Sequence, residues 1–170
     1  MSSSAATRQA FTRRSVPAAA ALTEALQGSL PQSTREVTQV RDGYAVLWLG
    51  PDEFLLMAPD EADGGPDPAA LTAELAAALG EHPGQVVDLS ANRTTLELAG
   101  PRAQDVLDKS CRLDLDPVAF PTGTAALTLL GSVGVILWRI DDEVWRVLPR
   151  SSFAVHIARW LLDGMVEFRS

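Results

Sequence analysis

The side chains best suited to chemistry in this chain are two histidines and one cysteine. His82 lies in a turn rich in glycine and proline, and His156 lies on a predicted helix away from its main apolar stripe, so we interpret both as solvated surface residues. Neither has a second ligand at the spacing that a metal site needs. Cys111 is the only cysteine, which excludes an intramolecular disulfide and a cysteine-rich metal site within this chain. The sequence therefore favours solvated histidines over metal binding or histidine base catalysis.

Acidic residues gather at two predicted turns, Asp52-Glu53 and 141–143. They could act as acid–base couples, but aspartate favours turns through its own local hydrogen bonds, and we prefer that interpretation. Gly131 and Gly134 come nearest to a dinucleotide-binding turn, but they lie between two predicted strands, whereas such a turn joins a strand to a helix. We find no Walker loop and no nucleophile elbow, so the sequence predicts no catalytic motif.

Tryptophan is prominent in a chain with few other aromatic residues. The four tryptophans are Trp48, Trp138, Trp145 and Trp160. Indoles fill protein cores, and they also anchor contacts with other chains. Both alternatives stay open for each tryptophan, and Trp48, Trp138 and Trp145 are candidate interface residues.

The charge of the chain restricts its partners. The formal net charge is −8 at pH 7, and Lys109 is the only lysine. Nucleic acids and anionic membranes are bound mainly through accumulated Lys and Arg, which disfavours both as partners. No segment approaches the roughly 20 consecutive apolar residues of a membrane helix, and 1–14 lacks the apolar region of a signal peptide. We therefore expect a cytoplasmic protein.

An internal repeat gives the clearest indication of the fold. Two stretches match at a constant offset of 90 residues, where Leu47-Trp48, Asp52-Glu53 and Pro59 recur as Leu137-Trp138, Asp142-Glu143 and Pro149. Each copy contains an apolar run, an acidic turn, a second apolar run and a proline before a helical pattern. The repeat predicts an α+β fold built from repeated β-hairpin–helix units with mainly antiparallel sheets.

The remaining pattern suggests a flexible arm over 1–14 and a single compact domain over 15–170, with two lobes, about 15–82 and 83–170, as an alternative. Helices are predicted over 17–27, ended by Gly28; over 68–79, capped by Asp67 and ended by Gly80; from Gly100-Pro101 to Cys111; and from Ser151 or Ser152 to Gly164. Strands are predicted over 36–40, 44–49, 53–58, 85–88, 94–98, 124–130, 133–140 and 143–148.

Some of these elements carry predictions for particular side chains. The third helix should bury the Cys111 thiol, and the last should bury a stripe of Phe153, Ile157, Trp160 and Leu161. In strand 94–98, Leu96 and Leu98 should face the core while Thr95 and Glu97 face water.

Several segments, taken in order, match the motifs of one family. They are the run from Leu47 to Leu56, Asp88-Leu89-Ser90 with Arg93, Gly100-Pro101 with Ala103, Leu113-Asp114-Leu115, Phe120-Pro121 with Gly123, and Pro149-Arg150-Ser151. Between about Tyr44 and Leu162 the chain resembles the gamma subunit of heterotetrameric sarcosine oxidase. That family is similar in turn to the folate-binding aminomethyltransferase domain of the glycine cleavage system, which implies an α+β fold of repeated sheet-and-helix units.

The resemblance implies a non-catalytic subunit that docks on alpha and beta subunits. The family's complex oxidatively demethylates sarcosine to glycine and passes the one-carbon unit to tetrahydrofolate, with FAD, FMN, NAD and tetrahydrofolate expected in the partner subunits. Arg93 and Arg150 are then candidate ion-pair anchors, or they cap carbonyl groups within their own fold. The alternative function is a stand-alone folate-binding or aminomethyltransferase-like protein.

Overall fold

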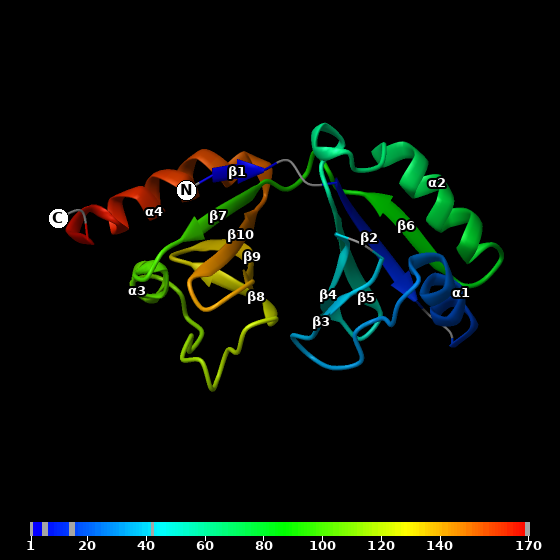
Figure 1. The fold of residues 1–170 in the computed structure, drawn as a ribbon, viewed down its shortest axis with the longest axis horizontal. Coiled ribbons are helices and arrows are strands. Elements are labelled where there is room, and N and C mark those ends of the chain that lie inside the picture. The colour runs from blue at the N-terminus through cyan, green and yellow to red at the C-terminus, as the bar shows by residue number, and fades with distance from the viewer. Residues whose placement is uncertain (1, 5–6, 14–15, 42, 169–170) are drawn as a thin grey trace. The chain divides into compact units, whose positions relative to one another are not determined.

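The computed structural model describes residues 2–4, 7–13, 16–41 and 43–168, which form two compact units (Figure 1). The N-terminal unit, Ala5–Ala91, contains β2 (Thr7–Arg13), α1 (Val16–Leu26), β3 (Val37–Gln39), β4 (Ala45–Gly50), β5 (Glu53–Ala58), the 3-10 helix η1 (Glu61–Asp63), α2 (Pro68–Leu79) and β6 (Gly84–Asp88). The C-terminal unit, Met1–Ser4 with Asn92–Ser170, contains β1 (Ser2–Ser4), β7 (Thr95–Ala99), α3 (Ala103–Asp108), β8 (Ala125–Leu130), β9 (Val133–Arg139), β10 (Val144–Pro149), η2 (Ser151–Phe153), α4 (Ala154–Gly164) and η3 (Val166–Phe168).

The N-terminal unit is a five-stranded sheet in the order β3-β4-β5-β2-β6 with α1 and α2 packed on one face (Figure 1). Its core joins Leu22 and Leu26 of α1 to the leucine stripe of α2 and to Phe54 and Leu56 of β5. The start of α2 follows from local chemistry, because the Asp67 carboxylate accepts a hydrogen bond from the Ala70 amide at 2.7 Å. The predicted cap of this helix is thus confirmed.

The C-terminal unit is a second five-stranded sheet, in the order β1-β7-β10-β9-β8. Helices α3 and α4 contribute to a core that includes Leu107, Val135, Trp145 and Leu161. Every strand pair in both sheets is antiparallel.

The predicted repeat is confirmed. Hairpin β4–β5 leads into α2, and hairpin β9–β10 leads into α4, so each copy of the repeated sequence forms a hairpin followed by a helix. The fold class is therefore α+β with antiparallel sheets, as the sequence predicts.

The N-terminal residues differ from the prediction of a flexible arm over 1–14. Their described part forms β1, paired with β7, and β2, which lies between β5 and β6 in its sheet. Strand pairing of this kind depends on partners far along the chain. A segment rich in Ser and Arg has no alternating apolar pattern from which a strand could be predicted. The two units also divide after Ala91, later than the lobe boundary suggested near 82, because β6 pairs with β2.

Two helices end earlier than predicted. Helix α1 ends at Leu26, and the next residue, Gln27, has a left-handed backbone with a φ of 52°. Glycine is required at position 28 for packing, because a Cβ there would lie 2.8 Å from the Val40 Cα. Helix α3 ends at Asp108, so Cys111 lies beyond it in a bridge to Leu130 and is only half-buried.

The start and the exposed side of α4 also correct the sequence prediction. Ser151 and Ser152 belong to η2, and no side chain caps α4 at its N-cap residue, Phe153. Ile157 and Leu161 are buried as predicted, whereas Phe153 and Trp160 are exposed. In β7, Leu96 and Leu98 face the core as predicted, but Thr95 is also fully buried.

Candidate functional site

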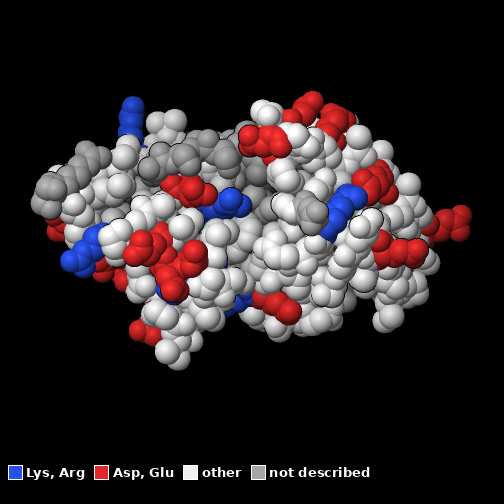
Figure 2. Space-filling model, in the orientation of Figure 1, with Lys and Arg blue, Asp and Glu red and all other residues white. Residues whose placement is uncertain are grey.

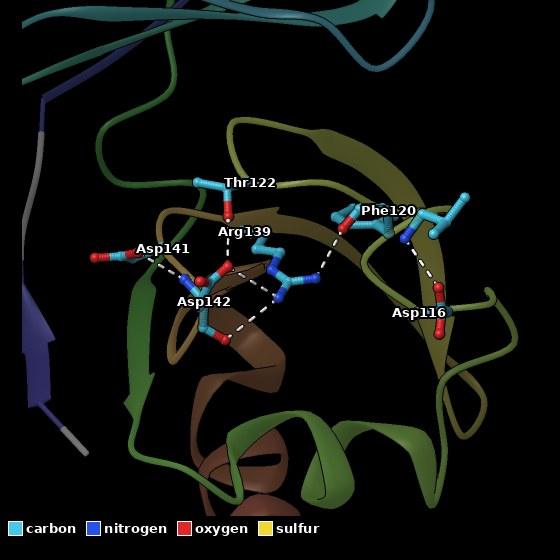
Figure 3. Close-up of polar contacts among 7 residues, drawn as sticks. Asp116, Phe120, Thr122, Arg139, Asp141 and Asp142 are labelled. Atoms are coloured by element: carbon cyan, nitrogen blue, oxygen red, sulfur yellow. Dashed lines mark hydrogen bonds and ion pairs between the residues drawn. The ribbon is translucent and has the colours of Figure 1, made fainter.

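A buried arginine organises the most polar part of the C-terminal unit. Arg139, at the end of β9, is 2% exposed, and its Nη1 donates to the Phe120 carbonyl oxygen at 3.0 Å (Figure 3). Its Nη2 reaches the carbonyl oxygen and Oδ1 of Asp142, both at 3.4 Å, and the Thr122 hydroxyl donates to the same Oδ1 at 3.2 Å. The guanidinium thus links the loop before β8 to the acidic turn between β9 and β10.

Aromatic rings complete this arrangement around Arg139. The Phe120 and Trp145 rings stack with centroids 5.6 Å apart, and the Arg139 guanidinium lies 5.1 Å from the Trp145 ring. The loop holding Phe120 is itself shaped by Asp116, whose carboxylate accepts from the Val118 amide at 2.9 Å and whose carbonyl oxygen accepts from the Phe120 amide at 2.8 Å. We interpret this cluster as a structural centre, because each polar contact joins segments of one unit.

The structure separates the four tryptophans into buried and exposed ones. Trp145 and Trp138 are buried, and the Arg146 guanidinium lies 5.3 Å from the Trp138 ring. Trp48 is half-buried and meets the Phe54 ring edge-on at 5.9 Å. Trp160, on α4, is 47% exposed, so it is the tryptophan most available to a partner.

The two arginine candidates lie side by side. Arg93 and Arg150 form an antiparallel backbone bridge, and the Arg93 Nη1 donates to the Leu148 carbonyl oxygen at 3.0 Å. Arg93 therefore caps a carbonyl group within its own unit, which was one of the two alternatives for it. Arg150 is exposed. Arg139 was not identified as a candidate from the sequence. Its one signal in the sequence is a charged residue at the end of an otherwise apolar strand.

Exposed apolar side chains concentrate near the end of the chain. Of the nine large apolar residues exposed in the described part of the chain, five lie between Phe153 and Val166: Phe153, Val155, Trp160, Leu162 and Val166, here called the α4 apolar surface. Residues seven apart share one side of a helix, which places Val155 and Leu162 on one stripe and Trp160 on another. Exposed apolar side chains that gather on one segment favour a docking role.

Lys109 ties the end of α3 to the last turn of the described chain. Its Nζ donates to the Gly164 carbonyl oxygen, forms an ion pair with Glu167 and lies 4.6 Å from the Phe168 ring. A small hollow of about 200 Å³ lies nearby between Gly100, Arg102 and Phe168. The C-terminal turn is thereby fixed to α3 by charge as well as by packing.

The histidines and acidic side chains form no metal centre in the part of the chain that the structure describes, where no three His, Cys, Asp or Glu residues come together. His82 and His156 are both exposed, as predicted. Acidic side chains are spread over the face shown in Figure 2, with few basic ones between them, in keeping with the net charge of −8. Within the described ranges, no helix is both long and apolar enough to span a bilayer.

Comparison with solved structures first defines the class of fold. The chain resembles the aminomethyltransferase T of the glycine cleavage system from Bartonella henselae, with a TM-score of 0.69 over 94% of this chain and 44% of that one. At 19% identity the likeness concerns the fold alone. Two antiparallel sheets with their helices therefore represent the aminomethyltransferase type of α+β fold.

Closer relatives then give the family. The model of the sarcosine oxidase gamma subunit family matches residues 13–167. Sarcosine oxidase subunit gamma from Corynebacterium sp. (strain P-1) and that from Arthrobacter sp. are each 51% identical over 92% of this chain and 75% of their own length. A chain of the heterotetrameric sarcosine oxidase from Corynebacterium sp. U-96, solved with pyrrole 2-carboxylate, is 45% identical with a TM-score of 0.89 over 98% of this chain and 83% of that one. The chain belongs to the sarcosine oxidase gamma subunit family.

Proposed function

We propose that this chain is a non-catalytic subunit of a heterotetrameric sarcosine oxidase, where it docks on alpha and beta subunits. The observation that carries the proposal is the family match over nearly the whole chain, together with the 45% identical chain in a solved oxidase of that composition. The buried Arg139 cluster supports a structural role, since its polar groups are used within the unit.

The reaction of the proposed complex is the oxidative demethylation of sarcosine. The N-methyl group loses two electrons, dioxygen is reduced to peroxide, glycine is released and the one-carbon unit passes to tetrahydrofolate. We assign FAD, FMN, NAD and tetrahydrofolate to the partner subunits. In support, the closest approach to a nucleotide-binding glycine turn in this chain, at Gly131, lies between strands β8 and β9. A cytoplasmic location of the complex is part of the same proposal.

The α4 apolar surface is the region that we assign to partner contact. Trp160 offers a large, half-exposed indole, and tryptophan is enriched among residues that dominate binding energy. Arg159 and His156 are exposed on the same helix and can meet polar groups at the rim of such a contact. Trp48 and Arg150 stay candidates for partner contact, whereas Trp145 is occupied within the core of its unit.

Co-expression with the alpha and beta subunits tests this function. We expect the wild-type chain to co-purify with them and the Trp160→Ser variant to be retained at least tenfold less, a loss of about 1.4 kcal/mol or more. Val118→Ser is the matched control, because Val118 is 93% exposed and lies on the loop between α3 and β8, outside the α4 apolar surface. A wild-type chain that remains a monomer and binds tetrahydrofolate by itself would contradict the proposed function.

A further inference from the structure

The two units share one strand order. The sheet of the N-terminal unit runs β3-β4-β5-β2-β6, and that of the C-terminal unit, taken from its other edge, runs β8-β9-β10-β7-β1. Along the chain, β2, α1, β3, β4, β5 and α2 correspond in turn to β7, α3, β8, β9, β10 and α4. Each position is matched by the equivalent element of the other unit, except the last.

The last position is filled in two different ways. In the N-terminal unit, β6 follows α2 and pairs with β2. In the C-terminal unit, the described residues after α4 form only η3, and the place beside β7 is taken by β1 from the opposite end of the chain. Ser2, Ser3 and Ser4 lie opposite Glu97, Leu96 and Thr95 in the antiparallel arrangement that β6 adopts beside β2.

We propose that β1 is a strap that completes the C-terminal unit and makes its stability depend on the N-terminus of the chain. The strap leads directly to β2, which is held in the other sheet by β5 on one side and β6 on the other. The chain therefore passes between the units twice, once before β2 and once after Ala91. This inference is independent of the proposed function.

The strap also protects a sheet edge. Without β1, the outer edge of β7 would present unpaired amide and carbonyl groups, which can pair with a strand of another chain. A strap of three paired residues is short, so it should open more readily than the sheet as a whole. Loss of β1 should consequently loosen β7 first and expose an edge suited to self-association.

Hydrogen exchange of the full chain tests the strap. In a Ser3→Pro, Ser4→Pro variant, β1 loses two backbone N–H donors. Hydrogen-bonded and non-hydrogen-bonded pairs alternate along antiparallel strands, so replacing two adjacent residues removes a donor of each kind. We expect peptides covering β7 to exchange about tenfold faster than in the wild type. A Ser3→Ala, Ser4→Ala variant keeps both amides and should exchange like the wild type. Peptides covering β4 and β5 should be unchanged in both variants, which would show that the N-terminal unit remains folded.

Two results would overturn the proposal. One is an unchanged exchange rate of β7 in the proline variant. The other comes from the wild-type chain, where the β1 amides must be protected in the native state. Unprotected β1 amides there exclude the strap even if the proline variant does not fold.

Discussion

At the scale of single residues, Arg139 shows how a buried charge is held by carbonyl oxygens together with one exposed carboxylate. Its shortest polar contact is with the Phe120 carbonyl oxygen, and the Asp142 carboxylate that it reaches at 3.4 Å is itself largely exposed. A guanidinium suits this position because its planar group of N–H donors can bond to two chain segments at once while its face lies against the Trp145 indole.

Replacement of Arg139 by methionine should therefore destabilise the chain. The Phe120 carbonyl oxygen loses its guanidinium donor, and we expect the free energy of unfolding to fall by about 1–3 kcal/mol. Denaturant titration followed by circular dichroism measures this loss. Arg102→Met is the control, because Arg102 is exposed and its ion pair with Asp105 should be worth less than about 1 kcal/mol. Equal effects of the two substitutions would contradict the role of Arg139.

Glu36 gives a prediction for pH dependence. The Gln32 amide, and then the amide and hydroxyl of Ser33, donate to its carboxylate, and these bonds hold the pKa of Glu36 below its ordinary value despite partial desolvation. A lowered pKa means that the folded state favours the ionised carboxylate. Its contribution to stability is present above the unfolded-state pKa and is lost as the pH falls through the folded-state pKa.

Glu36→Gln should thus be less stable than the wild type at neutral pH, and the difference should disappear under acidic conditions. Carbon NMR of the Glu36 carboxyl group would measure its titration directly. A midpoint at or above the ordinary value of a glutamate side chain would refute the effect.

At the scale of elements, local signals predicted structure well where neighbouring residues decide it. Helix α2 is announced by Asp67, Pro68 and Gly80, and each takes the expected place. The strands at the N-terminus could not be predicted because their partners, β5, β6 and β7, lie far along the chain. The role of Arg139 could not be predicted for a similar reason, since it depends on a contact with the loop before β8, which is distant in sequence.

The loop between β5 and α2 contains a glycine that packing requires. A Cβ on Gly65 would lie 2.1 Å from the Pro59 carbonyl oxygen, and the Gly65 amide donates to the Asp60 carbonyl oxygen at 2.8 Å. Gly65→Ala must therefore move the backbone, at a cost of about 1–3 kcal/mol. Thermal unfolding should show the loss, whereas Gly134→Ala, which meets no atom within 4 Å, should change the melting temperature little. A Gly65→Ala chain as stable as the wild type would show that this loop can rearrange freely.

At the scale of the whole molecule, the repeated hairpin and helix were predictable because the sequence repeats, whereas the residues that would meet a partner were not. Trp138 and Trp145 were candidates by residue type and prove to be buried, while exposed Trp160 was expected in the core. The sequence pattern of apolar side chains is the same whether they fill a core or contact another chain. Only their burial in the structure distinguishes the two roles.

Intrinsic fluorescence should report that contact. In the isolated chain, Trp160 should contribute emission typical of a hydrated indole, because it is 47% exposed while Trp138 and Trp145 are buried. Assembly with the partner subunits should shift this emission to shorter wavelength. Because the partners contain tryptophans of their own, the shift is defined as the difference from a Trp160→Phe chain assembled in the same way. A difference spectrum that assembly leaves unchanged would place the contact elsewhere.

Lys109 has a practical consequence for work on this protein. It carries the only side-chain amine of the chain, and that amine is engaged with Glu167, Gly164 and Phe168. Amine-reactive dyes, cross-linkers or sensor surfaces can therefore attach to one side chain only, and acylation there removes the charge that fastens the C-terminal turn. At that side chain, such reagents would disturb the contacts that hold the C-terminal turn to α3.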